Sequence, residues 1–381
     1  MRLVFLSSLV PEVSPRSGFA IANRAVVDGL RALGHEVVCV GAAQSHDGNL
    51  AGSVVIDVLN VENAGASVEQ KTGWAVASFT SGIPFAAAKL KALGAAAVSE
   101  AVDSAKADAL VVNSYQMAAA FPGLVRRPYA YVAHNVEHRS AAANARRSGS
   151  IGERFMFARD ARLLRALERR LCDGAAHVWT LTEEDRTALV GTAERSCVLP
   201  LLLPEQDAPG DPPAKAFDAA MIGTWSWAAN ANGLRWFIER VVPLLPDDVR
   251  IAVAGSVPAS IPLADRRLVA MGRVDDADAF LAQAHVIPLV AQGGTGVQLK
   301  TVEAFQKGFA TVATPSSVRG IERLPDNCEV HREPTAFAEA LVNAARRGRN
   351  GAHLRVDPAD WVNGQREGLH RALRAGAEAL S

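Results

Sequence analysis

The chain has 381 residues, and its forty lysine and arginine residues balance forty aspartate and glutamate residues, so the formal net charge is zero. That length predicts two domains, or one large domain with an ample core. The composition, 49% hydrophobic and 21% charged, excludes a collagen, a coiled coil and a wholly disordered chain. The neutral balance also argues against a protein that coats nucleic acid, which needs an excess of positive charge.

Short apolar runs alternate with helical patterns through the first half of the chain. Such nearly continuous apolar runs are typical of parallel strands that are covered on both faces, and their alternation with helices favours a doubly wound α/β sheet. A helix is predicted at 20–33, ending at Gly34, and 61–84 is expected to be a loop. The predicted strands are 2–8, 35–41, 53–59, 109–114, 129–135, 177–182 and 197–203.

The rhythm stops at 200–216, a stretch with five prolines that reads as an interdomain linker, and then restarts. Strands are predicted at 218–224, 250–256, 285–291, 309–315 and 327–331. Helices are predicted at 233–245, 275–284, 297–307, 335–347 and 365–380. We therefore expect two Rossmann-like domains, 1–205 and 206–364, that face each other across a cleft, and a final helix, 365–381, that crosses back to the first domain.

Targeting and metal signals are weak in this sequence. The four cysteines show no CxxC pairing, so four reduced thiols are the simplest expectation, and neither a zinc site nor a disulfide framework is indicated. The first residues carry too short an apolar run for a signal peptide, and no stretch approaches a membrane span. The acidic run 275–278 looks like a helix start. We expect a cytoplasmic protein with no essential metal or cofactor.

The glycine-rich loop that follows the predicted strand 285–291 is the richest candidate site. Gly293, Gly294 and Gly296 would let the backbone approach an anion, and the helix that begins next offers free N–H groups. Lys300 adds a full charge one turn later, and Glu303 follows three residues on, where its carboxylate could accept hydrogen bonds from ribose hydroxyls. Together these features describe a nucleoside diphosphate site. The alternative is a glycine-rich turn with a surface Lys–Glu pair.

Two other loops carry aromatic or polar groups just past predicted strands. Trp225, Trp227 and Asn230 open the second domain, where aromatic and amide groups can meet a ligand, and the next aromatic residues, 236–237, fit the core. His134 ends a strand in the first domain and is followed closely by Glu137 and His138. The strand-end position favours a site for His134, whereas a Glu137–His138 metal or acid–base pair lacks a supporting cluster. The acidic residues 183–185 most simply begin a helix.

An arginine-rich stretch lies at 126–170, with eleven arginines against four acidic residues, a net of +7. On a helix over 153–171, leucines and Phe157 gather on one side and arginines on the other. A basic amphipathic helix of this kind can touch an anionic membrane, so peripheral contact with the inner membrane face is one hypothesis. An ordinary helix that packs on the sheet and exposes its arginines is the preferred alternative.

Three segments of the second half give a more specific resemblance. IGTWSWAANANGLRWF, LVAQGGTGVQLKTVEAFQKG and ATPSSVRGIE resemble the carboxyl-terminal domain of GT-B glycosyltransferases, near the retaining family four, in a subgroup with a Trp/Asn-rich opening. The first half is similar more loosely, through SPRSGFAIANRAVVDGLRALGHEV, YVAHNVEHR and TLTEEDR. The resemblance implies a GT-B fold and transfer of a sugar from a nucleoside diphosphate sugar to a glycan, lipid-linked or small-molecule acceptor, with retention.

The resemblance also implies residue roles. Lys300 would hold the donor diphosphate and stabilise the leaving group with backbone groups around Gly294, Thr295, Gly296 and Val297. Glu303 would bind the ribose, and Arg273 and Val274 would line the nucleobase pocket. Trp225 and Asn230 are expected to contact the donor because of their place just past a strand, not because of the resemblance. Gly18 would admit phosphate or acceptor, and His134 would face the transferred sugar or the reacting centre as a catalytic residue.

Two departures from the family pattern matter. Thr295 stands eight residues before Glu303, where the family usually has an acidic residue tied to the donor sugar, and Trp225 and Asn230 occupy the region of a usual Arg–Lys pair. Two alternatives stay open. Because a fold does not fix the reaction, the chain could be a nucleotide-sugar epimerase or hydrolase, and the missing acidic residue adds weight to a non-catalytic nucleotide-sugar-binding partner.

Overall fold

The computed structural model describes the chain except for residues 16, 46, 62–65, 192–193, 205–213 and 295. The chain divides into two compact units, which we call the N-terminal unit (Met1–Pro204 and Arg366–Ser381) and the C-terminal unit (Glu205–Gln365). Each unit contains one parallel sheet with helices between its strands, so the predicted pair of doubly wound α/β domains is confirmed.

The sheet of the N-terminal unit has seven strands in the order β3-β2-β1-β4-β5-β6-β7. All adjacent strands pair in parallel, and the strand order reverses between β1 and β4, where Leu3 pairs with Ala109. The strands are β1 (Arg2–Leu9), β2 (Glu36–Ala43), β3 (Ser53–Val58), β4 (Ala109–Asn113), β5 (Tyr129–Ala133), β6 (His177–Thr180) and β7 (Ser196–Val198). β7 is shorter than predicted, since Pro200 has no N–H to continue the ladder.

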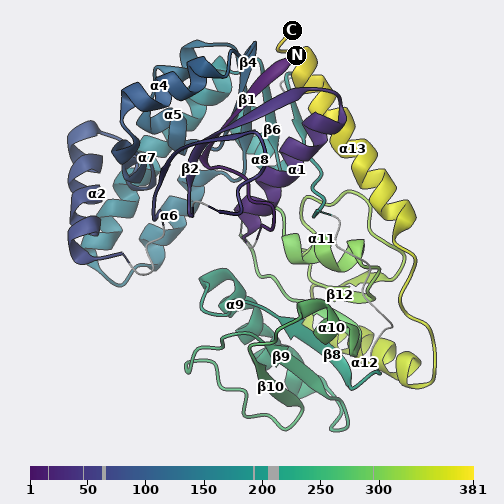
Figure 1. The fold of residues 1–381 in the computed structure, drawn as a ribbon. Coiled ribbons are helices and arrows are strands. Elements are labelled where there is room, and N and C mark those ends of the chain that lie inside the picture. The colour runs from purple at the N-terminus through teal and green to yellow at the C-terminus, as the bar shows by residue number, and fades with distance from the viewer. Residues whose placement is uncertain (16, 46, 62–65, 192–193, 205–213, 295) are drawn as a thin grey trace. The chain divides into compact units, whose positions relative to one another are not determined.

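Helices cover this sheet and form much of the left side of the unit in Figure 1. They are α1 (Gly18–Ala32), α2 (Val68–Ser81), α3 (Phe85–Ala88), α4 (Ala95–Ser104), α5 (Gln116–Ala120), α6 (Glu137–Arg147), α7 (Ile151–Gly174) and α8 (Glu183–Val190), with short turns η1 (Lys89–Leu93) and η2 (Leu124–Arg126). α8 confirms the helix start predicted at 183–185: the Thr182 hydroxyl accepts the N–H of Asp185.

The expectation of a loop over 61–84 is wrong for its second part, because α2 lies there. The helix begins with a capping box, in which the Ser67 hydroxyl accepts the N–H of Gln70 and the Gln70 side chain accepts the N–H of Ser67. This four-residue signature is visible in the sequence, but the weak amphipathic pattern that follows it hides the helix. Gly82 then ends α2 in the left-handed conformation.

The sheet of the C-terminal unit has six parallel strands in the order β10-β9-β8-β11-β12-β13, and its order reverses between β8 and β11. The strands are β8 (Phe217–Ile222), β9 (Ile251–Ala254), β10 (Leu268–Gly272), β11 (Ala284–Leu289), β12 (Thr311–Ala313) and β13 (Cys328–Val330). β10 was not predicted. It is an edge strand of which only Leu268 is buried, so it lacks the apolar run of the central strands.

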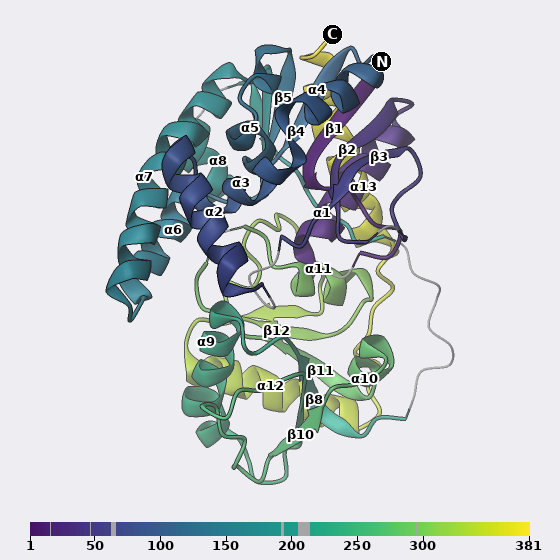
Figure 2. The ribbon, with the colours of Figure 1, turned by 60° about the vertical axis from the view of Figure 1, so that its left-hand side comes forward.

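The helices of this unit are α9 (Ala228–Trp236), which continues through η3 (Phe237–Val241) and η4 (Val242–Leu244), then α10 (Ala277–Ala282), α11 (Leu299–Gln306) and α12 (Pro334–Arg349). α10 begins in the acidic run, as predicted, with the Asp276 carboxylate accepting the N–H groups of Asp278 and Ala279. Both views of the ribbon show α9, α10 and α12 around the sheet (Figures 1 and 2).

The last helix, α13 (Ala359–Glu378), starts six residues earlier than predicted. The Asp357 carboxylate accepts the N–H of Ala359, and Pro358 occupies a position where a missing N–H costs nothing. Its first turns belong to the C-terminal unit, where Trp361 packs against Phe305, and the rest belongs to the N-terminal unit beside α1 (Figure 1).

The arginine-rich helix α7 packs against the rest of the N-terminal unit and exposes arginines, as the preferred alternative predicted. Its apolar side, including Leu164, Leu167 and Leu171, is buried in the core, while Arg162 and Arg165 are exposed. Among the described residues, none of the helices combines the length and apolar composition that a bilayer-spanning segment requires.

Candidate functional site

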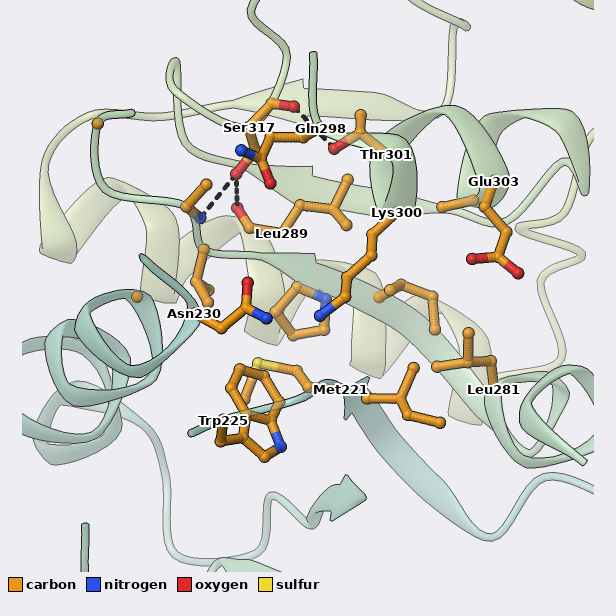
Figure 3. A pocket seen from close by; sticks show the side chains of 18 residues that line it. Met221, Trp225, Asn230, Leu281, Leu289, Gln298, Lys300, Thr301, Glu303 and Ser317 are labelled. Carbon is orange, nitrogen blue, oxygen red and sulfur yellow. Dashed lines mark hydrogen bonds between the residues drawn. The ribbon is translucent and has the colours of Figure 1, made fainter. Parts of the chain in front are cut away.

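A pocket opens in the C-terminal unit where the strand order reverses, at the carboxyl ends of β8 and β11. Ligands of open α/β sheets bind at such a point. Figure 3 shows side chains from β8, the loop after it, β11 and α11 converging there. The lining residues that matter for the argument are Met221, Trp225, Asn230, Gln298, Lys300 and Glu303.

Lys300 extends from the first turn of α11 across this pocket toward Trp225 and Asn230 (Figure 3). Its Nζ lies 5.2 Å from the centroid of the Trp225 ring, a cation–π arrangement. Lys300 is an exposed residue, but the walls of the pocket remove part of the water around its ammonium group. This desolvation lowers the pKa of Lys300 to about 8, and the Glu303 carboxylate opposes the shift. Lys300 is thus a cation that an anionic ligand can reach.

The Lys300 side chain passes close to the loop after β8, where glycines leave the room that it needs. A Cβ on Gly223 would lie 2.7 Å from Lys300 Nζ and 3.1 Å from the Trp225 ring. Gly255, with φ of +102°, would place a Cβ 2.0 Å from the carbonyl oxygen of Gly223, so only glycine fits there. Trp225 is itself buried and donates from Nε1 to the carbonyl of Ala254 at 2.7 Å. Its ring therefore forms a fixed part of the pocket wall and is not exposed for a ligand to stack on.

The other two members of the Trp/Asn-rich opening differ from Trp225. Asn230 lines the pocket and donates from Nδ2 to the carbonyl of Thr224 at 3.0 Å, which ties α9 back to the loop. Trp227 is 71% exposed and does not line the pocket. The sequence did not show which of Trp225 and Trp227 would belong to a site. In the structure Trp225 is buried and lines the pocket, whereas Trp227 is exposed and does not.

The N-terminus of α11 faces the same pocket. The side chain of its N-cap residue, Gln298, makes no capping hydrogen bond, so this helix end can offer N–H groups to an anion. Glu303, one turn further, lines the other end of the pocket and pairs with Lys307 at 3.2 Å. Lys307 also pairs with Asp278, so the Glu303 carboxylate is oriented but only partly engaged.

Two residues that sequence reasoning missed shape the loop before α11. Ser317 is buried; its Oγ donates to the carbonyl of Leu289 at 2.7 Å and accepts the N–H of Ala291 at 2.9 Å. Arg319 donates twice to the carbonyl of Gly296, from Nε at 3.0 Å and from Nη2 at 2.8 Å. The segment that contains them, 313–322, was recognised as a motif, but only tertiary contacts reveal what these side chains hold.

Five further predicted donor residues, Gly294, Gly296, Val297, Arg273 and Val274, do not line the pocket. Gly294 is exposed, while Gly296 and Val297 lie between the pocket-lining Gly293 and Gln298. Arg273 is exposed and Val274 half-buried in the loop after β10. Thr295 lies outside the described residues.

The N-terminal unit carries a buried polar network at its own strand-order reversal. The Asn113 amide at the end of β4 donates to Ser7 Oγ of β1 at 3.1 Å and to Asn23 Oδ1 of α1 at 2.8 Å. Its Oδ1 faces His134 Nε2 at 2.8 Å, directly after β5. Because the Asn113 Nδ2 donates to two partners, its Oδ1 accepts, and the His134 proton lies on Nε2. Nδ1 is then an acceptor.

His134 is neutral around pH 7, because burial lowers its pKa to about 4. Its ring packs against Phe19, with centroids 5.0 Å apart. Phe19 follows Gly18 in the first turn of α1, so Gly18 and His134 belong to the same corner of the N-terminal unit. The structure places these two predicted residues near each other in the N-terminal unit, whereas the residues that line the Lys300 pocket belong to the C-terminal unit.

Glu137 and His138 do not form the pair that the sequence left open. His138 Nδ1 lies 2.6 Å from Glu168 of α7, which also accepts the backbone N–H of Glu137 at 2.6 Å. Glu168 thus caps the start of α6 from a buried position. Burial raises the pKa of Glu137 to about 7. Across the described residues, no three His, Cys, Asp or Glu side chains are grouped to hold a metal ion.

Comparison with protein families gives a match in each half of the chain. Residues 216–347 match the family described as glycosyl transferases group 1, and residues 17–201 match the glycosyl transferase 4-like domain. No curated protein sequence matches the chain.

Solved structures of known proteins are similar over the whole chain. HepE from Anabaena, in complex with UDP and glucose, has 15% identity, a TM-score of 0.63, and coverage of 100% of this chain and 99% of its own. WaaG, a glycosyltransferase involved in lipopolysaccharide biosynthesis, has 15% identity and a TM-score of 0.58 with the same coverage. The apo form of WaaB, a lipopolysaccharide outer core galactosyltransferase, has 10% identity and a TM-score of 0.54, again with 100% and 99% coverage. At such identities the likeness establishes the fold.

Proposed function

We propose a specific reaction for this chain, which is a glycosyltransferase of the GT-B fold built from a glycosyl transferase 4-like domain and a group 1 domain. It transfers a sugar from a nucleoside diphosphate sugar to a glycan, lipid-linked or small-molecule acceptor, with retention of the anomeric configuration. Retention enters through the resemblance of its motifs to the retaining family four. The similar HepE binds UDP and glucose, which supports a nucleotide-sugar donor.

The observation that carries the proposal is the Lys300 pocket. An ammonium, an uncapped helix N-terminus and a glycine-rich loop converge at the carboxyl end of the sheet. This combination suits a diphosphate, and negative charge builds up on that diphosphate as the glycosidic bond to it breaks. Donors already aimed at the leaving group stabilise the charge without reorganising. Glu303 is assigned to the ribose hydroxyls.

His134 is assigned to the transferred sugar. As a neutral imidazole with its proton on Nε2, it offers Nδ1 as an acceptor for a sugar hydroxyl, and the Asn113 network fixes the ring. A neutral His134 orients a hydroxyl rather than supplying a proton. The proposal includes no metal and no further cofactor.

The test is nucleotide binding by Lys300→Ala and Glu303→Ala, measured by calorimetry with the best ligand from a screen of UDP, GDP, ADP and dTDP. Loss of a charged hydrogen bond predicts about 10- to 100-fold weaker binding for Lys300→Ala. Arg346→Ala and Glu339→Ala, two exposed residues of α12, are the matched controls and should bind like the parent protein. Unchanged affinity in both pocket variants would refute the site.

Turnover separates this reaction from the two alternatives. Donor incubated without acceptor should be consumed slowly, whereas rapid release of nucleotide or isomerised sugar would indicate a hydrolase or an epimerase. Nucleotide binding with no turnover across a broad acceptor panel would indicate a non-catalytic binding partner.

A further inference from the structure

Four large apolar side chains of the N-terminal unit are exposed next to one another on α2 and α7. They are Val76, Phe79, Ile151 and Phe155, with exposures of 56%, 48%, 85% and 64%, and we call them the α2–α7 patch. The rings of Phe79 and Phe155 stack across the two helices, with centroids 6.5 Å apart and planes within 6°. Val76 and Ile151 lie one helical turn from these rings. Contiguous exposed apolar groups of this kind mark interaction surfaces.

Partly buried polar contacts fix the helices that carry this patch. The Arg159 guanidinium lies 4.4 Å from the centroid of Phe79, and its Nη2 donates to the carbonyl of Ser78 at 2.8 Å. Asp160, beside it on α7, accepts the N–H of Phe85 at 2.9 Å. α2 is therefore clamped to α7, and the two rings point outward from a defined scaffold.

Three arginines lie close to the start of α7 along the chain. Arg146 and Arg147 end α6 and are exposed, three residues of turn separate them from Ile151, and Arg154 donates to the carbonyl of Ser148 in that turn. α2, α6 and α7 lie together in both ribbon views (Figures 1 and 2).

The acidic residues of 126–170 do little to offset the positive charge of these arginines at the surface. Glu168 and Asp160 are buried and hydrogen-bonded inside the unit, and Glu137 is half-buried. Glu153 is the one acid of this stretch that is exposed. The outer surface is therefore more basic than the net charge of the segment.

We propose that the α2–α7 patch, with Arg146, Arg147 and Arg154, is a docking surface for an anionic lipid bilayer. Aromatic and branched side chains favour the boundary between headgroups and acyl chains, and arginines pair with lipid phosphates. The charge pattern selects this occupant, because the arginines flank the apolar groups and complement a negatively charged surface. The surface differs from the one that the sequence suggested, since the leucine side of α7 is buried and only its first turns contribute. The proposal needs no donor site and stands apart from the transferase reaction.

The experiment is co-sedimentation of the full chain with vesicles of mixed phosphatidylcholine and phosphatidylglycerol, and with vesicles of pure phosphatidylcholine. We expect binding to the mixed vesicles that weakens as salt rises. Arg146→Gln with Arg147→Gln should reduce the partition coefficient about thirtyfold, and Ile151→Ser with Phe155→Ser by at least about tenfold. These residues are exposed, so nucleotide affinity and the thermal midpoint should match those of the parent protein.

Matched controls are Arg371→Gln with Arg374→Gln, two exposed arginines of α13, and Leu244→Ser, an exposed apolar residue of the C-terminal unit. Both controls should keep the parent affinity for the mixed vesicles. Equal binding to both vesicle types, no binding at low salt, or equal losses in patch and control variants would overturn the proposal. A dimer that Ile151→Ser with Phe155→Ser dissociates, without vesicle binding, would assign the patch to a second copy instead.

Discussion

Lys300 combines an ammonium group that the pocket walls partly desolvate with access to solvent. Crowding lowers its pKa to about 8, which places its titration close to the physiological range. A bound diphosphate would favour the charged form and raise this pKa again. Nucleotide binding and proton uptake are therefore linked at this residue.

We predict that nucleotide affinity is constant near pH 7 and falls as the pH rises through about 8, because the free protein then holds Lys300 neutral and binding must recruit a proton. A diphosphate carries its full charge above about pH 7, so it adds little to the slope. Calorimetry of the parent protein between about pH 7 and about pH 9 measures the effect.

Lys300→Arg is the control, because arginine stays charged throughout this range. Its affinity for nucleotide should be independent of pH there, even if it is lower overall. A parent protein with the same flat profile would show that Lys300 does not meet the phosphate.

Among the single elements, α13 packs into the core of the N-terminal unit, although it follows the C-terminal unit in the sequence. Trp179 of β6 donates from Nε1 to the carbonyl of Ala372 at 2.8 Å, and Gly376 leaves room for the Trp179 ring, which a Cβ would meet at 2.0 Å. Leu373, fully buried, packs over Gly29 of α1. The helix thus closes the N-terminal unit.

Leu373→Ala is predicted to lower the free energy of unfolding of the N-terminal unit by about 2–5 kcal/mol, since it removes buried methyl groups and leaves a cavity. Urea denaturation followed by circular dichroism measures this change. Arg374→Ala, at the exposed neighbouring position, should change the stability by less than about 0.5 kcal/mol. Equal effects of the two substitutions would mean that α13 does not support this core.

Elements differ in how well the sequence predicts them. The central strands β1, β4 and β5 are recognisable because burial on both faces demands a continuous apolar run. The edge strand β10 is covered too little to carry that signal, and α2 exposes apolar side chains that blur its amphipathic pattern. Both departures arise where tertiary contacts, rather than local pattern, decide what is buried.

At the scale of the whole molecule, each unit places a polar site at its own reversal of strand order. The C-terminal unit has the Lys300 pocket between β8 and β11, and the N-terminal unit has the Ser7–Asn113 network between β1 and β4. The two sites differ in charge, because Lys300 brings a cation and His134 is neutral. An anionic nucleotide is therefore expected to bind the C-terminal unit.

This division predicts how a ligand affects unfolding. Nucleotide at about 100 times its dissociation constant should stabilise the C-terminal unit by about 2.7 kcal/mol, because it binds only the native state. Scanning calorimetry should show that one transition moves upward with nucleotide, while the transition that Leu373→Ala lowers does not. A nucleotide shift of the Leu373-sensitive transition alone would place the ligand in the N-terminal unit.

The sequence by itself determined the fold class, the alternation of strands and helices in two halves, and the glycine loop with Lys300 and Glu303, because these depend on local pattern and on spacing along one helix. The tertiary structure decided what each side chain meets. It buried Trp225 beneath Lys300 and left Trp227 outside, paired His138 with Glu168, and turned Phe79 and Phe155 outward beside arginines. Contacts between residues far apart in the chain depend on how helices pack on sheets, and no local pattern encodes that packing.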